Sequence, residues 1–457
     1  MRLIERRWLR FAFLALVLLA TLAGDAIRFT FGWWTFGVLV VLLGAASVWL
    51  LIAHRDRWRV GTLPYPLLAF LGLALLSIAW SHYRDATALG LFTTGLIVVG
   101  ALAIAVAFSW EELLRGLSVV LRAVLGLSLL FELFVSTVIR APILPLFTQP
   151  GVDYSQYDTL PPLLYWSRNE LFEVFDEGRI QGIVGNANNL GFLALLAVIV
   201  FAIQLADRSI GRVHGAAWLG ITALTLALTR SATVTVALVG VGIVAGVVVL
   251  VRRASTGRGR TLVYVIAAAG AGVLALLALT FQRGILELLG KSADLTGRIG
   301  IWESVTELAQ QRSAFGWGWV SYWMPWAAPF DNLAFRNGVR QLQAHNVWLD
   351  VWFQLGVIGV VIFAALVLST LTRSWILAVD RPVELAVRLA SGRARGALRS
   401  TAAYRALSLL PLLIFTALIV QSVAESRLLG EYGMLFLVIF AVKTKAAVAP
   451  GPYALAR

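Results

Sequence analysis

The stretch from Asp294 to Asp350 combines the residue types from which a phosphate-handling site can be built, although apolar chain lies on both sides of it. Arg298, in the sequence LTGR, carries a planar guanidinium that can bind a diphosphate through two hydrogen bonds at once. His345 directly precedes Asn346 and an apolar run, and imidazole is the side chain best suited to take up a proton near neutral pH. Each also has a simpler interpretation. Arg298 can pair with Asp294 or a lipid phosphate, and His345 can be an ordinary membrane-boundary residue.

A second group of candidates lies upstream. Arg230 ends an apolar run in the sequence LTRSA, and Arg179 opens the amide-rich sequence RIQGIVGNANNLG, which contains Asn188. The simpler interpretations are that Arg230 reaches lipid headgroups and that Asn188 or Asn189 caps a helix. Arg122 lies inside an apolar run, where a charge is costly unless it faces a partner or a cavity.

Aromatic residues surround the GWGW turn at 316–319, followed by Tyr322, Trp323 and Trp326. Such rings can stack on sugars, but we expect them in the aromatic belt of a membrane boundary. The sequence holds no HExxH, P-loop, serine elbow, DxD-like pair or cysteine/histidine cluster. Metal-assisted hydrolysis and nucleotide-driven chemistry therefore have no residue basis, and we expect no cofactor.

The elements that must position these residues are apolar helices. Of the residues, 60% are hydrophobic and 14% charged, and the mean hydropathy is +0.84, so the apolar runs must face lipid. Many runs have about the 20 residues that a helix needs to cross a bilayer. We predict an all-α, polytopic transmembrane bundle with twelve spans near residues 9–24, 33–53, 65–80, 88–108, 116–138, 189–205, 215–229, 232–251, 261–281, 347–371, 406–424 and 429–443.

The distribution of charge predicts the orientation of the bundle. Most of the 38 lysines and arginines fall at the termini and in alternate connections, above all in the basic segment 372–405. Because positive loops stay inside, both termini should be cytoplasmic, and the two long loops at 139–188 and 282–346 should be exoplasmic. Part of the basic segment, 381–404, alternates apolar residues with arginine and predicts an amphipathic helix at the membrane surface. In a membrane protein this charge faces lipid rather than nucleic acid.

The motifs between Arg179 and about Leu368, in their order and spacing, resemble the bacterial O-antigen ligase and O-antigen polymerase superfamily. They are R-x-x-G-x-x-x-N-x-N, a T-R-S turn, T-G-R with I-W, G-x-G, and A-H-N leading into a span that contains QLGVIG. The resemblance implies a GT-C-like membrane fold and transfer of polyprenyl-linked glycans at the outer face of the bacterial inner (plasma) membrane.

By this resemblance, Arg298 and Arg230 hold the diphosphate of the donor and His345 activates the acceptor hydroxyl. We also expect Arg179, Asn188 and Asn346 to contact the substrate. The sequence departs from the family in two places. The turn often reads S-R-x in the family, which would place its arginine at Ala232, and the common N-P-N is here Asn186-Ala187-Asn188.

We therefore expect a metal-independent, inverting glycosyltransferase that moves a glycan from polyprenyl (undecaprenyl) diphosphate to a glycan or lipid acceptor. Ligase, polymerase and protein O-glycosyltransferase remain open. The alternative is a transporter of a small solute or anion, which should carry ionisable residues near the middle of the membrane, where Arg122 is the obvious candidate. A third option is a scaffold subunit, in which Arg298 and His345 would be dispensable.

Overall fold

The computed structural model describes residues 6–148, 152, 154–173, 178–281, 284, 297–336, 339–380 and 404–448. Asp294 and most of the predicted surface helix, residues 381–403, lie outside this part. The described part of the chain is mostly helical, which confirms the predicted all-α class. Its α-helices are α1 (Arg7–Leu22), α2 (Gly24–Ala53), α3 (Tyr65–Leu76), α4 (Arg84–Ala107), α5 (Trp110–Phe134), α6 (Ala187–Ala206), α7 (Arg212–Thr229), α8 (Ala232–Arg253), α9 (Gly257–Thr280), α11 (Arg298–Gln311), α12 (Val347–Val379), α14 (Leu410–Ser422) and α15 (Glu431–Val448).

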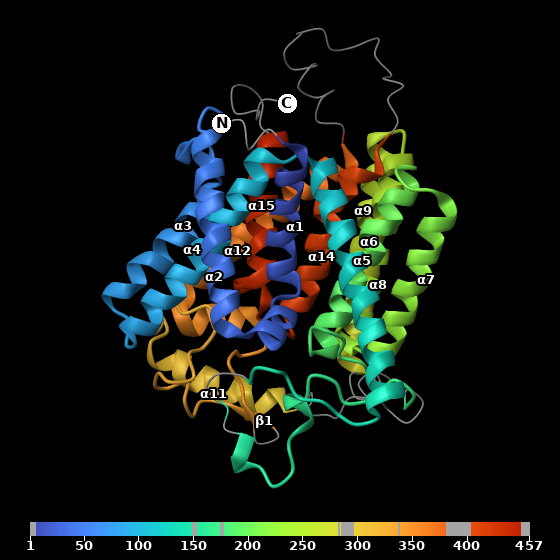
Figure 1. The fold of residues 1–457 in the computed structure, drawn as a ribbon. Helices are drawn as coiled ribbons and strands as arrows, with labels where there is room; N and C mark the ends of the chain where they lie inside the picture. The colour runs from blue at the N-terminus through green and yellow to red at the C-terminus, as the bar shows by residue number, and fades with distance from the viewer. Residues whose placement is uncertain are drawn as a thin grey trace.

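Each predicted apolar segment coincides with one of these helices, and all of them except α11 run along one bundle (Figure 1). Among the described residues, seven helices are long and apolar enough to cross a membrane, namely α2, α4, α5, α6, α8, α9 and α12. The helices α1, α3, α7, α14 and α15 are shorter or more polar. The molecule is thus a multi-pass helix bundle, and the count of twelve spans stays a prediction.

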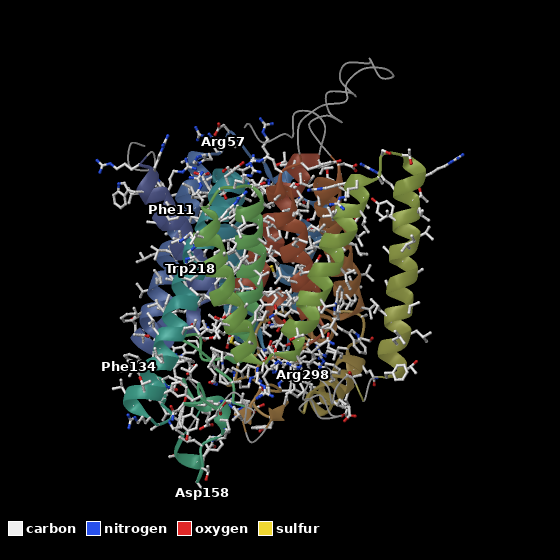
Figure 2. All side chains as sticks on the ribbon, turned by 90° about the vertical axis from the view of Figure 1, so that its right-hand side faces the viewer. Phe11, Arg57, Phe134, Asp158, Trp218 and Arg298 are labelled. Atoms are coloured by element: carbon white, nitrogen blue, oxygen red, sulfur yellow. The ribbon has the colours of Figure 1, made fainter. Side chains whose placement is uncertain are left out.

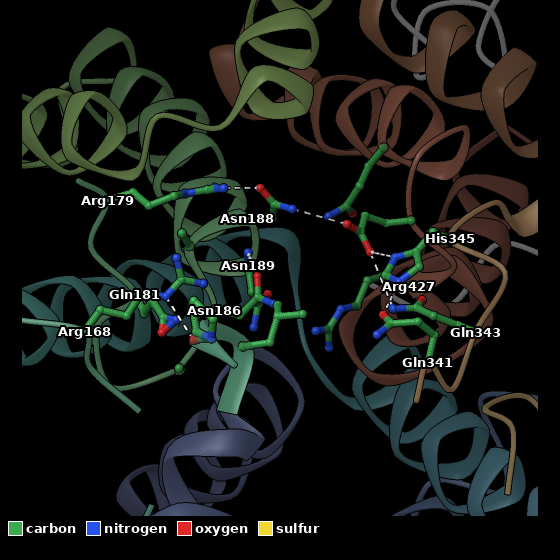
Figure 3. Close-up of a pocket in the computed structure, with 16 residues that line it drawn as sticks. Arg168, Arg179, Gln181, Asn186, Asn188, Asn189, Gln341, Gln343, His345 and Arg427 are labelled. Carbon is green, nitrogen blue, oxygen red and sulfur yellow. Dashed lines mark hydrogen bonds and ion pairs between the residues drawn. The ribbon is translucent and has the colours of Figure 1, made fainter. Parts of the chain in front are cut away.

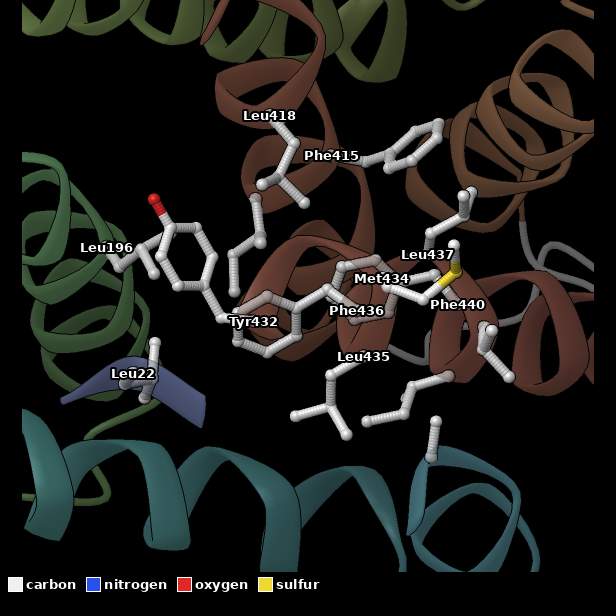
Figure 4. Close-up of a cluster of buried hydrophobic side chains, with 14 of the residues drawn as sticks. Leu22, Leu196, Phe415, Leu418, Tyr432, Met434, Leu435, Phe436, Leu437 and Phe440 are labelled. Atoms are coloured by element: carbon white, nitrogen blue, oxygen red, sulfur yellow. The ribbon is translucent and has the colours of Figure 1, made fainter. Parts of the chain in front are cut away.

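Helix α15 forms the centre of the bundle. Every residue from Tyr432 to Thr444 is buried. Its rings pack against side chains of α14, α6 and α1, including Phe415, Leu418, Leu196 and Leu22 (Figure 4). At the other extreme, the apolar window of α9 has no buried residue, as expected for a helix whose whole surface faces lipid.

The two ends of the bundle differ. The start of α1 and the end of α15 lie at one end, which we call the terminal face, together with Arg57 (Figures 1 and 2). The α5–α6 connection, α11 and the hairpin of β1 (Phe335–Arg336) and β2 (Val339–Arg340) lie at the opposite end, the loop face. The chain therefore has the predicted one-sided arrangement of its long loops. Which face is cytoplasmic stays a prediction.

The GWGW turn belongs to the interior of the loop face. Trp319 and Trp323 are 0% and 1% exposed, and they pack with Phe330, Phe353 and Phe70. Their indole nitrogens donate to Thr94 Oγ1 (3.0 Å) and Asp350 Oδ1 (2.8 Å). The prediction that these rings form a membrane belt is therefore wrong for both. The N–H group of a buried indole usually needs a hydrogen-bond partner, and Thr94 and Asp350 supply it here. Trp326, 63% exposed, can still contact lipid.

A break in the helix α12 allows the GWGW turn to form hydrogen bonds with the backbone of that helix. Gly356 has a φ of 68° inside α12, and the break frees backbone groups on both sides of it. Trp317 and Gly318 donate to the carbonyls of Phe353 and Gln354 (3.0 and 2.9 Å), and Val357 donates to that of Ser313 (2.8 Å). The loop that leads toward His345 is thus hydrogen-bonded to a membrane helix.

We predict that Gly356→Ala lowers the free energy of unfolding by about 3 kcal/mol. A Cβ atom at Gly356 would lie 2.1 Å from the carbonyl oxygen of Ala314, in a backbone conformation that L-residues avoid. Denaturant unfolding in mixed micelles measures the change. Gly246→Ala in α8, where a Cβ atom meets nothing within 4 Å, is the matched control. Equal stability of the two variants would contradict the prediction.

Candidate active site

A cavity of about 360 Å³ lies among helix ends on the loop face (Figure 3). Its walls come from residues 162–168 and 179–189 of the α5–α6 connection and the start of α6, from 341–345 before α12, and from 421–427 between α14 and α15. This volume is in the range that accommodates small ligands. The ionisable side chains that line it are Arg168, Arg179, His345, Glu425 and Arg427.

Glu425 connects the groups on one side of the cavity. Its Oε1 accepts from Arg298 Nη2 (2.8 Å), and its Oε2 lies 3.0 Å from His345 Nδ1. The side-chain amides of Asn188 (3.4 Å) and Gln343 (3.5 Å) also donate to this carboxylate. Arg298 and His345, 47 positions apart in the sequence, therefore converge on one buried carboxylate.

The electrostatics keep this carboxylate ionised. Burial by itself would raise the pKa of Glu425, but the charge and hydrogen bond of His345, with the charges of Arg298 and Arg427, outweigh burial and lower that pKa to about 2. An ionised carboxylate can only accept hydrogen bonds, so the facing nitrogen Nδ1 of His345 must carry a proton and donate. The other ring nitrogen, Nε2, lies 3.1 Å from Oε1 of Gln341 at the cavity wall.

The backbone around His345 is held in an uncommon conformation. His345 has a φ of 52°, and Asn346 follows as the N-cap of α12, accepting from the amides of Trp348 (3.0 Å) and Leu349 (3.3 Å). The buried Asp350 accepts from the amide of Ala344 (3.0 Å) and from the hydroxyl of Ser426. A residue keeps such a strained backbone conformation only where the surrounding contacts hold it there. Residues of this kind are often found at functional sites.

Arg179 and Asn188 form the facing side of the cavity (Figure 3). Arg179 Nη2 donates to Asn188 Oδ1 (2.9 Å), and its Nε donates to the carbonyl of Thr229 (3.2 Å). Ser231 Oγ donates to the same Asn188 oxygen (2.9 Å). The N-cap of α6 is Asn186, which accepts from the amide of Asn189 (3.0 Å). Asn188 is therefore not needed as a cap and is left to bridge Arg179 and Glu425.

A buried carboxylate of α5 fixes the start of this wall. Glu132 Oε1 accepts from the amides of Gln181 (2.9 Å) and Gly182 (2.6 Å), and its Oε2 accepts from Ser167 Oγ (2.7 Å). Gly182 has a φ of 60°, and a Cβ atom there would lie 2.5 Å from Ser128. The backbone of the cavity wall at Gln181 and Gly182 is thus held in place by side chains of the membrane helix α5.

The structure brings together four of the residues that the sequence singled out, namely His345, Arg298, Arg179 and Asn188. Arg298 lies beside His345 on Glu425, and Arg179 is the arginine on the facing side of the cavity. Arg230 caps α7 with a φ of 45°, and its side chain is exposed and does not line the cavity. The two residues next to Arg230 contact the cavity wall instead. The carbonyl of Thr229 accepts from Arg179, and the hydroxyl of Ser231 donates to Asn188.

Two other candidates have local partners. The side chain of Asn346 is used to cap α12, so it positions His345 through the backbone. Arg122 lies over the rings of Phe201 (5.3 Å) and Trp218 (5.8 Å), with Nη2 3.4 Å from Gln204 Oε1. Cation–π contacts of this kind stabilise a charge in an apolar setting.

Sequence reasoning missed Glu425, Arg427 and Arg168. Glu425 and Arg427 stand in the short sequence AESR between the last two apolar segments, and this pair of opposite charges at a predicted membrane boundary was the available signal. Among the described residues, no three histidine, cysteine, aspartate or glutamate side chains are grouped as a metal ion would require.

These features define a multi-pass α-helical membrane protein with a buried, charged cavity at the end that carries its long loops. Residues 215–364, about a third of the chain, match the family model described as O-antigen ligase. This match confirms the resemblance to the O-antigen ligase and polymerase superfamily. The matched segment contains Arg230, Arg298 and His345, whereas Arg179 and Glu425 lie outside it. No curated protein matches the chain.

Proposed function

We propose that the protein transfers a glycan from polyprenyl diphosphate to a hydroxyl group of a glycan or lipid acceptor at the exoplasmic face of the inner membrane, without a metal. The family match supports an O-antigen ligase-like membrane glycosyltransferase. The observation that carries the finer proposal is the convergence of Arg298 and His345 on Glu425 beside the cavity. Together they supply an anion-binding group and a proton acceptor in one place.

In the proposed reaction, the bond between the anomeric carbon and the diphosphate oxygen breaks, and its electron pair leaves with the polyprenyl diphosphate. The acceptor oxygen forms the new bond to the same carbon, and its proton passes to Nε2 of His345. For this step His345 is the neutral imidazole with its proton on Nδ1, so that Nε2 is unprotonated, and the acceptor hydroxyl displaces the side chain of Gln341 from this nitrogen. Attack from the side opposite the leaving group inverts the anomeric centre.

Guanidinium groups stabilise the charge that develops on the leaving diphosphate. Arg179 and Arg427 line the cavity, and Arg298 borders it through Glu425. Arg298 is 8% exposed, and its Nε has no hydrogen-bond partner in the described part of the chain. A buried donor of this kind is costly unless a ligand oxygen satisfies it, as a phosphate oxygen of the donor would.

The position of these charges favours transfer over transport. The groups that line the cavity come from helix ends and loops on the loop face, whereas a transporter places its ionisable groups near the middle of the membrane. Arg122, the candidate inside a span, already has aromatic and amide partners.

We predict that the purified full chain transfers glycan from a polyprenyl-diphosphate-linked donor in the presence of EDTA. Product analysis should show release of polyprenyl diphosphate and a new glycosidic bond of inverted configuration. The matched control is the same preparation with glycan lacking the diphosphate, from which transfer should not occur because no leaving group is present. Activity that EDTA abolishes, or a product that retains configuration, would contradict the mechanism; absence of transfer to glycan and lipid acceptors alike would contradict the function.

A further inference from the structure

Arg168 is a cavity residue that the proposed reaction does not use. It lines the side of the cavity opposite His345 and Arg427 (Figure 3). Its Nε donates to the carbonyl of Pro162 (3.0 Å). With the Gln181 amide oriented to satisfy its neighbours, the Gln181 oxygen also accepts from this Nε (3.2 Å), while its nitrogen donates to the carbonyl of Tyr165 (3.2 Å). These contacts hold the inner edge of the guanidinium and leave its two terminal nitrogens for another partner.

The other arginines at the cavity differ from Arg168 in their pairing. Arg298 forms an ion pair with Glu425, and Arg427 forms one with Glu431, which also accepts from Arg28 (3.0 Å). Within the described residues, Arg168 has no ion pair and its terminal nitrogens have no hydrogen bond. Arg179 already donates to Asn188 and to the carbonyl of Thr229. In the described part of the chain, Arg168 thus differs from these arginines in having both terminal nitrogens available to an anion.

Two carboxylates, Glu170 and Glu132, lie near Arg168 without forming an ion pair with it in the described part of the chain. Burial lowers the pKa of Arg168, and the charges of Glu170 and Glu132 oppose that effect. The oxygens of these carboxylates accept instead from backbone amides, Glu170 from Arg179 (2.9 Å) and Glu132 from Gln181 and Gly182. The guanidinium of Arg168 stays protonated, as arginine does in proteins, and neither carboxylate occupies its terminal nitrogens.

The setting suits an anionic sugar. A guanidinium fork matches the two oxygens of a phosphate or a carboxylate. Pro162 and Leu163 beside it add apolar surface against which the C–H face of a sugar ring can pack. Arg168 also belongs to the α5–α6 connection, which extends beyond the helix ends (Figure 2). The diphosphate of a membrane-anchored donor should lie closer to the helices.

We propose that Arg168 binds a phosphate or carboxylate group carried by the acceptor glycan, which would make this protein selective for acidic acceptors. The assignment to the acceptor rests on the proposed function. The anion site itself rests on the geometry of Arg168, Gln181 and Pro162.

Equilibrium binding of glucose 6-phosphate and of glucose to the full chain tests this proposal, with polyprenyl diphosphate present to fill the donor site. The parent should prefer the phosphorylated sugar by about tenfold, since a charge-assisted pair is typically worth that much. Arg168→Gln should abolish the preference, and Arg168→Lys should keep part of it. Arg140→Gln is the matched control, because Arg140 is exposed in the same connection and bonds to the carbonyl of Thr137.

A thermal transition recorded for each variant separates loss of binding from loss of fold, and Arg168→Lys provides a second variant if Arg168→Gln is unstable. A parent without preference, or an Arg168→Gln variant that retains the preference, would overturn the proposal. Weaker binding of polyprenyl diphosphate by Arg168→Gln would also overturn it, because Arg168 would then belong to the donor site. Phosphate preference through Arg168 in a protein that transfers no glycan would refute the proposed function and leave the anion site standing.

Discussion

Replacing His345 with asparagine should lower the rate of glycan transfer by about three orders of magnitude. Asparagine tolerates the positive φ of this position, so the backbone that joins the loop to α12 should keep its shape. What the change removes is the ring nitrogen Nε2 that takes the acceptor proton. Donor binding should change little, because Arg179 and Arg298 remain in place.

The measurement is the single-turnover rate with donor bound in advance, compared with the equilibrium binding of polyprenyl diphosphate. His82→Asn is the matched control: His82 is exposed, bonds to Arg312 (3.3 Å) and lies outside the cavity. A His345→Asn variant that turns over at the rate of the control would remove the proton acceptor from the mechanism. A variant that loses donor binding instead would assign His345 to the diphosphate.

The helices of this protein could be predicted from sequence because the membrane imposes one requirement on each of them. A segment that crosses lipid must be apolar over about 20 residues, so α4, α8 and α12 stand out without any knowledge of their neighbours. The polar loops were then predicted as the segments that join these apolar helices. Helix ends were predicted less well; α12 extends to Val379, beyond the predicted 371.

The candidate site could be predicted only in part, because its geometry depends on pairings between distant segments. His345 and Arg298 are recognisable by type and by their family motifs. Glu425 is not, since its importance comes from contacts with residues 80 and 127 positions away. Trp323 was assigned to a membrane boundary because sequence shows an aromatic residue but not the buried carboxylate, Asp350, that receives its N–H group. Arg230 and Ser231 differ by one position, yet Ser231 is the one whose side chain bonds to Asn188.

Replacing Glu425 with glutamine should lower transfer by about a hundredfold, the effect expected when a group that orients a functional imidazole loses its charge. Glutamine keeps the shape of the side chain and one acceptor oxygen. It removes the charge that fixes the Nδ1 proton of His345 and balances Arg298. The folded protein should also be less stable, because the buried guanidinium of Arg298 would remain without its carboxylate partner.

The stability change should depend on pH in a definite direction. The pKa of Glu425 is depressed in the folded protein to about 2, so its stabilising contribution is fully present above the ordinary glutamate pKa. It is lost as the pH falls from about 4.5 toward 2, where the folded protein also takes up the proton. The difference in melting temperature between parent and Glu425→Gln should therefore be present at pH 5 and shrink as the pH falls below that value.

Thermal melts in detergent across this pH range measure the difference, with Glu307→Gln as the matched control, because Glu307 is exposed on α11. The two readouts together separate the roles of Glu425. A pH-dependent difference in stability with full activity would make Glu425 purely structural, and loss of activity with parent-like stability would make it act on His345 alone. Since one carboxylate contacts both Arg298 and His345, we expect activity and stability to fall together.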